Sequence, residues 1–198
     1  MISNVRALLL CSIPFALLGC AGANSGRLYL HPLNTHKEYS QRFTQSYAAH
    51  DVDGSYEFLL IADDADRRRP KVPGQPLRPS TGTPLREVIY VRIPWMPMRG
   101  NVSQTLVANA VVDWYIFSDA PEHQNDVVKY SGVGYALADQ KDGIIQLELR
   151  SATLQPQIVR GDFHDPLGKF RLSGDVSAAN FPQRLHAILD ATRARLKP

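Results

Sequence analysis

Asp162 and Asp165 flank His164 in the segment GDFHDPLG, and these residue types can perform acid–base or metal chemistry. A neutral histidine beside a carboxylate can serve as a general base or as a metal ligand. Hydrolysis would also need a nucleophile or further ligands, for which His50, Asp51 and Asp53 are the only dense candidates. The segment equally fits a turn, because Asp-Pro and Leu-Gly mark turns and Asp caps them through its own backbone. We favour the turn, and assign no catalytic residue and no metal ligand.

Five basic residues and five prolines gather at residues 63–84, DDADRRRPKVPGQPLRPSTGTP, where the apolar periodicity stops. A long loop of this composition is typically functional or disordered. Arginine matches phosphate in a bidentate geometry, which suits a lipopolysaccharide core or an anionic lipid headgroup. The alternative is a solvated insertion whose charge keeps it soluble. The candidate anion-binding or partner-binding residues are Arg67, Arg68, Arg69, Lys71 and Arg78.

Trp95 and Met96 lie between two prolines and Met98 follows the second, with Arg92 and Arg99 on either side. Exposed tryptophan and methionine with arginine at the rim have the composition of a protein interface. A second interpretation is that Trp95 closes one end of a sheet while the prolines end the strand.

A short apolar run, ALLLCSIPFALL at residues 7–18, precedes Cys20. A membrane-spanning helix needs about 20 residues, whereas the apolar region of a secretory signal has about 7–15. The residues Leu17-Leu18-Gly19-Cys20 that end the run resemble the lipobox of bacterial lipoproteins. An ordinary signal peptide with an A-x-A-like site at Ala21-Gly22-Ala23 is the competing interpretation.

The lipobox resemblance implies cleavage after Gly19, with lipid on the sulfur and the new amine of Cys20. It also implies anchoring at the outer membrane, because Ala21 is not the aspartate that commonly retains such proteins at the inner membrane. Cys11 would leave with the signal. The mature chain would then have no disulfide, no thiolate nucleophile and no cysteine metal ligand.

Charge and length set further bounds. The formal net charge of +3 becomes +2 without Arg6, which is too small a surplus for nucleic-acid binding. We divide the chain into a signal at 1–19, a lipidated cysteine and tether at 20–26, and one globular domain at 27–198. The tether reaches about 20 Å at most when extended.

Period-two alternation of apolar residues predicts strands in most of the domain. Residues 180–196 instead predict an amphipathic helix, with Asn180 as cap and Gln183 at the capping-box position. Asp-Gly pairs at 53–54 and 142–143 predict turns between strands. We therefore expect a mainly β domain, a single antiparallel meander forming a barrel or sandwich, with one C-terminal amphipathic α-helix. The strands are expected at 35–47, 56–62, 87–93, 106–117, 127–137, 143–150 and 169–176.

Three functions remain open for this domain. The favoured one is a non-catalytic envelope lipoprotein, held on the bilayer through acylated Cys20, that binds a protein or an envelope polymer. The second is a lipocalin-like carrier of a small apolar ligand, because Gly132 and Gly134 suit a sheet curved around a cavity. The third is a hydrolase that uses His164 and Asp165. None of the three is expected to need a cofactor.

Overall fold

The computed structural model describes residues 26–34, 38–63, 85–96, 108–118, 126–161 and 167–196. Within these ranges the chain forms nine strands and a single α-helix that follows them. The elements are β1 (Gly26–Pro32), β2 (Tyr39–Arg42), β3 (Gln45–His50), β4 (Tyr56–Asp63), β5 (Leu85–Ile93), β6 (Ala110–Ser118), β7 (Val127–Lys141), β8 (Ile144–Arg160), β9 (Phe170–Asn180) and α1 (Pro182–Ala194).

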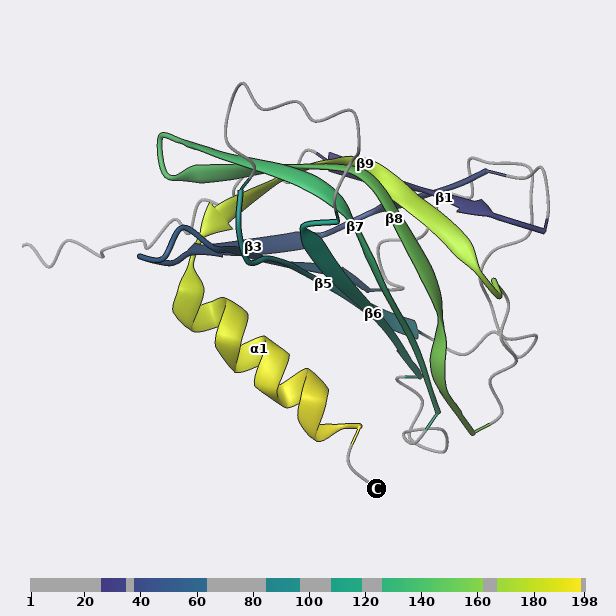
Figure 1. The fold of residues 1–198 in the computed structure, drawn as a ribbon. Coiled ribbons are helices and arrows are strands. Elements are labelled where there is room, and N and C mark those ends of the chain that lie inside the picture. Colours follow the sequence, from purple (N-terminus) through teal and green to yellow (C-terminus); the bar gives the residue numbers. More distant parts are fainter. Residues whose placement is uncertain are drawn as a thin grey trace, which may run out of the picture.

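The strands β3 to β9 form an antiparallel meander in which each strand pairs with the next (Figure 1). The first and last strands of this meander also pair with each other, in parallel, at Tyr47↔Ala179 and Ala48↔Asn180. The sheet therefore closes on itself as a barrel. The hairpin of β1 and β2 extends it by pairing β1 with the earlier part of β9. The mainly β fold and the single C-terminal helix predicted from the sequence are confirmed.

Aromatic side chains occupy the centre of the barrel. Trp114, Tyr130 and Phe170 are fully buried, and their ring centroids lie 5.1–6.1 Å apart in tilted and edge-to-face contacts. Aliphatic side chains from all the strands of the barrel complete this inner cluster. The inward-facing residues thus form a packed core.

A second apolar cluster lies outside the barrel, where α1 covers the sheet (Figure 1). Leu185 and Leu189 of the helix are buried against outward-facing residues such as Leu59, Val88 and Tyr115. The strands under the helix are consequently buried on both faces. That burial explains why β4, β5 and β6 contain continuous apolar runs where half-buried strands would alternate.

Gly132 and Gly134 mark a place where β7 and β8 come unusually close. A Cβ atom at Gly132 would overlap the carbonyl oxygen of Thr153, and one at Gly134 would overlap that of Ser151. The pairing register shifts on either side of them, at Lys129/Tyr130 and Tyr135/Ala136. The two backbones therefore lie too close at these positions for a side chain larger than hydrogen.

The start of the helix differs from the prediction. Asn180 is the last residue of β9, and α1 begins at Pro182 with Phe181 as its N-cap and no capping side chain. The capping-box prediction was wrong because the ring of Pro182 presets the first helical residue and needs no backbone donor. Phe181, which the predicted helix 180–196 included, lies before the first helical residue and is 53% exposed.

Several strand boundaries also differ, three of them in an informative way. In the described part of residues 35–47 there are two strands, interrupted where the Thr44 amide and hydroxyl donate to the Ile61 carbonyl at 2.8 and 3.2 Å. The strand predicted at 143–150 continues to Arg160, because a register shift after Leu149 reverses the alternation. Gly26, assigned to the tether, is the first residue of β1.

Candidate functional site

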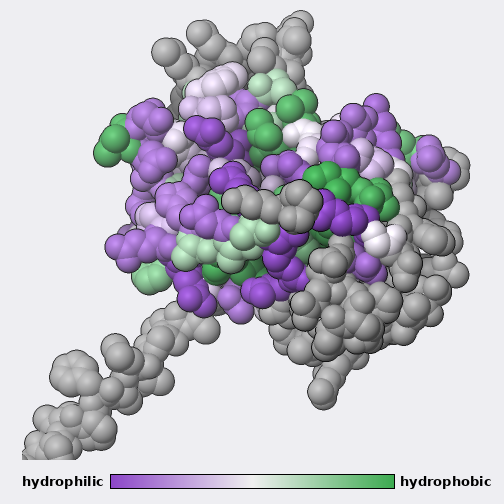
Figure 2. All heavy atoms as spheres, turned by 90° about the horizontal axis from the view of Figure 1, so that it is seen from below, coloured by the Kyte–Doolittle hydropathy of each residue, from purple (hydrophilic) through white to green (hydrophobic). Residues whose placement is uncertain are grey.

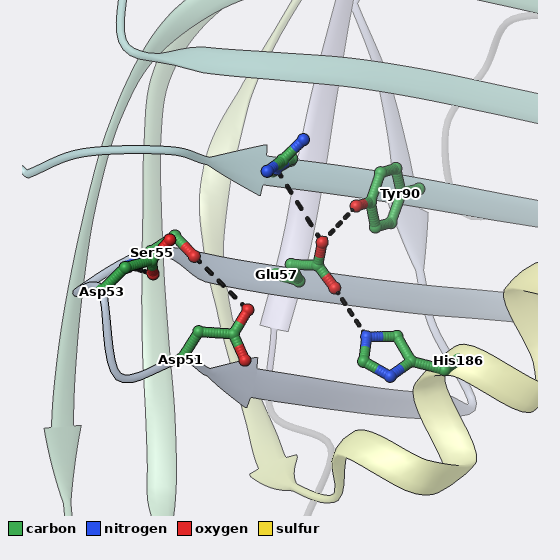
Figure 3. A network of polar contacts seen from close by, with 7 residues as sticks. Asp51, Asp53, Ser55, Glu57, Tyr90 and His186 are labelled. Atoms are coloured by element: carbon green, nitrogen blue, oxygen red, sulfur yellow. Dashed lines mark hydrogen bonds and ion pairs between the residues drawn. The ribbon is translucent and has the colours of Figure 1, made fainter.

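A polar cluster lies at the junction of α1 with β4 and β5, centred on Glu57 (Figure 3). Tyr90 donates a hydrogen bond of 2.6 Å to Oε1 of Glu57, and Nε2 of His186 lies 2.9 Å from Oε2. Arg92, opposite Glu57 in the β4–β5 register, lies 3.9 Å from Oε1. Both oxygens of this carboxylate are therefore engaged, one by the sheet and one by the helix.

The surroundings of Glu57 change the pKa values of the cluster. Burial by itself raises the pKa of Glu57, but the hydrogen bonds from Tyr90 and His186 and the charges of His186 and Arg92 outweigh it and lower that pKa below its usual value. Burial, together with the hydrogen bond to Glu57 and its charge, raises the pKa of Tyr90. Glu57 is thus held as a carboxylate and Tyr90 as a neutral hydroxyl, which is the pairing that keeps their hydrogen bond.

A second cluster surrounds Asp113 on the neighbouring strands. Tyr115 donates to Oδ2 at 3.1 Å, Ser131 donates to Oδ1, and Nζ of Lys129 lies 3.2 Å from Oδ1. Burial raises the pKa of Tyr115, and the charge of Asp113 and the hydrogen bond to it raise that pKa further. Both oxygens of this carboxylate are engaged as well.

Arg193 of α1 connects the two clusters. Its guanidinium lies 5.6 Å from the ring centroid of Tyr90, and its charge also acts on Tyr115, where it opposes the rise in pKa. A cation over a tyrosine ring is attracted by the ring quadrupole. Near the end of the helix, Arg195 donates to the Ser118 carbonyl at 2.8 Å and lies 4.3 Å from the Phe117 ring centroid. Together these contacts hold the helix on the barrel.

The turn between β3 and β4 contains the other carboxylates drawn in Figure 3. The Ser55 amide donates to Asp53 Oδ1 at 2.9 Å, and the Gly54 amide donates to the Asp51 carbonyl at 3.0 Å. Hydrogen bonds from the Ser55 backbone and side chain lower the pKa of Asp53. His50 stacks on Tyr56 at 4.2 Å. These residues form the turn between strands that the Asp-Gly pair at 53–54 predicts.

The outer face of β6 and β7 carries apolar side chains where α1 does not cover it. Val111 and Val133 are directly opposite in the register and are 45% and 57% exposed. Arg92 lies opposite Val111 on β5, and Arg150 lies 5.7 Å from the Tyr135 ring centroid. We call Val111, Val133 and Tyr135, with Arg92 and Arg150 beside them, the β6–β7 surface.

Apolar surface is sparse on the side of the molecule toward which α1 lies. Among the coloured residues in Figure 2, hydrophilic ones predominate, and apolar ones form several separate groups. Val111 and Val133 differ from scattered surface residues in that they are exposed apolar residues directly opposite each other in the register.

Most of the site residues proposed from the sequence lie outside the described residues. Trp95 and Met96 are the exceptions: Trp95 is 45% exposed, whereas Met96 packs against the inner core. Asn109 donates to the Trp95 carbonyl at 3.2 Å and so fixes this segment to the start of β6. The residues outside the described ranges are Cys20, Arg67, Arg68, Arg69, Lys71, Arg78, Met98, Asp162, His164 and Asp165.

The sequence did not indicate the Glu57 cluster. Tyr90 and His186 lie 33 and 129 residues from Glu57, on three different elements, so no local motif contains them. The available signal was the presence of Glu57 and Tyr90 among the apolar residues of β4 and β5. Such residues indicate a polar contact, because buried polar groups require partners.

In the described ranges no group of three or more His, Cys, Asp and Glu side chains could hold a metal ion. The helix α1, the one helix in the part of the chain that the structure covers, is not long and apolar enough to cross a membrane. Comparison of the chain with protein-family models, with curated proteins and with solved structures found no match.

Proposed function

We propose that this chain is a lipid-anchored protein of the bacterial envelope, without catalytic activity, that binds a protein partner through the β6–β7 surface. The anchor is Cys20, and its support is the lipobox resemblance of Leu17-Leu18-Gly19-Cys20. The observation that carries the binding role is the exposed pair Val111 and Val133, which lie directly opposite each other on β6 and β7.

The composition of this surface favours a protein as its partner. Interfaces combine an apolar centre with tyrosine and arginine, and the β6–β7 surface has all three. Fully burying a valine contributes about 1.5–3 kcal/mol, so covering the exposed halves of the two valines contributes about 2 kcal/mol. That value fits the centre of a modest interface, to which the surrounding polar residues add specificity.

The polar clusters support a binding role over catalysis. Glu57 and Asp113 have both oxygens engaged by tyrosine, serine or cationic side chains, and these contacts join α1 and the strands to one another. A catalytic carboxylate needs an oxygen directed at the reacting group. The hydrolase alternative depends on His164 and Asp165, which lie outside the described residues.

The packed interior bears on the carrier alternative. A lipocalin-like carrier holds its ligand inside the barrel, where this chain places the rings of Trp114, Tyr130 and Phe170 in mutual contact. An apolar ligand would have to displace these rings, so the exterior is the better candidate for binding.

Photocrosslinking in intact cells tests the proposed function. A photoreactive amino acid in place of Val133 is expected to give a discrete adduct with one envelope protein. The same substitution at Val159 is the matched control and should not give that adduct. Val159 is 47% exposed and lies near the C-terminal end of β8, away from Val133. The adduct should also disappear when Val111→Asp is added. Identical adducts from both positions, or none from Val133, would reject this surface as the binding site.

A further inference from the structure

Four exposed apolar residues surround one end of the barrel. Val52 is fully exposed in the turn between β3 and β4, and Trp95, Ile144 and Phe181 are 45–53% exposed. Trp95 follows β5, Ile144 begins β8, and Phe181 precedes α1. We call this set the apolar rim.

The register places all four at the same end. Ile93 pairs with Tyr56, so Trp95, two residues later, lies beside the turn that contains Val52. Asn180, at the end of β9, pairs with Ala48 shortly before the same turn, so Phe181 lies near it. Ile144 pairs with Ala179 and therefore lies at this end as well. In Figure 1 the β3–β4 turn, the β7–β8 turn and the end of β9 all lie at the left of the barrel.

The first described residue, Gly26, leads toward the same end. It pairs with Val176, and because β1 is antiparallel to β9, the chain enters β1 from the side on which β9 ends. Four residues separate Val176 from Asn180, or about 13 Å of strand. The six residues that follow Cys20 reach about 20 Å. A fully extended tether is therefore long enough for an anchor at Cys20 to reach beyond the apolar rim.

We infer that the end of the barrel carrying the apolar rim rests on the bilayer surface, with Trp95 and Phe181 in its interfacial layer. This inference rests on the proposed lipid anchor and adds the orientation of the domain. Tryptophan and phenylalanine suit this position, since aromatic rings favour the headgroup level and apolar side chains gain by leaving water.

The charges at the rim indicate which lipids the surface accepts. Its turns carry Asp51, Asp53 and Asp142, with Lys141 as a cation, so carboxylates are in excess. These carboxylates repel anionic headgroups and tolerate zwitterionic ones. The occupant is therefore a surface rich in phosphatidylethanolamine or phosphatidylcholine, bound through apolar side chains.

The two tryptophans of the chain provide the test. The lipidated mature protein carrying Trp114→Phe has Trp95 as its only tryptophan. It is reconstituted into phosphatidylcholine vesicles with or without bromine on the acyl chains. Bromine is expected to lower Trp95 fluorescence at least twofold. Trp95→Phe, which leaves only the buried Trp114, should show no change. If Trp114→Phe does not fold, the quenching of Trp95 by bromine is obtained as the difference in quenching between wild type and Trp95→Phe.

A second pair of variants checks the rim itself. Adding Phe181→Asp should reduce the quenching of Trp95, whereas Val159→Asp, near the opposite end of the barrel, should not. Intact mass separates the two proposals. An acylated, vesicle-bound protein with unquenched Trp95 overturns the inference alone. An unacylated Cys20 overturns the proposed anchor and the inference with it.

Discussion

Tyr90 donates a hydrogen bond of 2.6 Å to Glu57 across the β4–β5 pair, directly beneath the edge of α1. The second oxygen of Glu57 lies 2.9 Å from His186, so a single carboxylate joins two strands to the helix. The helix covers a sheet region that would otherwise expose apolar side chains. The attachment of α1 to the barrel should therefore depend on this carboxylate.

Replacing Glu57 should destabilise the fold measurably. Glu57→Gln and Tyr90→Phe are each expected to lower the free energy of unfolding by about 1–3 kcal/mol, because each disrupts a charge-assisted hydrogen bond. The double variant should lose less than the sum, which urea unfolding of all four proteins would measure. Glu148→Gln is the control. Its ion pair with Arg150 is about half exposed on both sides, so it should cost less than about 1 kcal/mol. Strict additivity would show that the two groups do not interact.

The stability should fall in acid because of the same group. The folded protein holds the pKa of Glu57 below the usual 4.5, so its contribution is present above that pH and is lost as pH falls through the lowered value. The free energies of unfolding of wild type and Glu57→Gln should differ at pH 6 and converge below the folded-state pKa. A constant difference across this range would assign the effect to packing and not to charge.

Alanine at Gly132 should be much more damaging than alanine at a turn glycine. Its Cβ would overlap the backbone of β8, so we expect a loss of about 3 kcal/mol or more, at the level of severe core strain. At Gly143 nothing lies within 4 Å of a Cβ, and only the φ of +75° opposes alanine, at about 1–2 kcal/mol. Thermal unfolding of both variants tests this order. Equal losses would contradict the close approach of β7 and β8.

Asn109, the residue before β6, should contribute strongly to the stability of the fold. Its side chain accepts from the Ala136 amide and donates to the Ala136 carbonyl, both at 2.9 Å, in a buried site. Asn109→Ala leaves those backbone groups without a side-chain partner and should cost about 2–4 kcal/mol. Asn180→Ala removes an exposed side chain that caps nothing, and should change stability by less than about 0.5 kcal/mol. A larger loss at Asn180 would restore the capping role that the sequence suggested.

The strand pattern could be predicted from the sequence wherever a strand is buried on one face. β9 is an example, because Phe170, Leu172 and Val176 alternate with exposed residues. The full length of β8 could not, since its register shift after Leu149 moves the apolar residues to the other parity. The closure of the barrel also depends on the short parallel pairing of β3 with β9, which no local pattern encodes.

The candidate site was less predictable than the fold. Glu57, Tyr90 and His186 come together only after the β4–β5 register and the path of α1 are fixed. In the sequence, Val111 and Val133 do not differ from other apolar strand residues. They are exposed because α1 does not cover this part of the sheet. The sequence singled out residues dense in charge or aromatic character, whereas the described surface depends on long-range placement.

Intact mass spectrometry of the protein extracted from membranes tests the central claim, the anchor at Cys20, most directly. The account predicts a chain that begins at Cys20 and carries the added mass of a diacylglyceryl group and an amide-linked acyl chain. Cys20→Ala should abolish both the added mass and the recovery with membranes. An unmodified chain that begins at Asn24, after the alternative site Ala21-Gly22-Ala23, would contradict the lipid anchor.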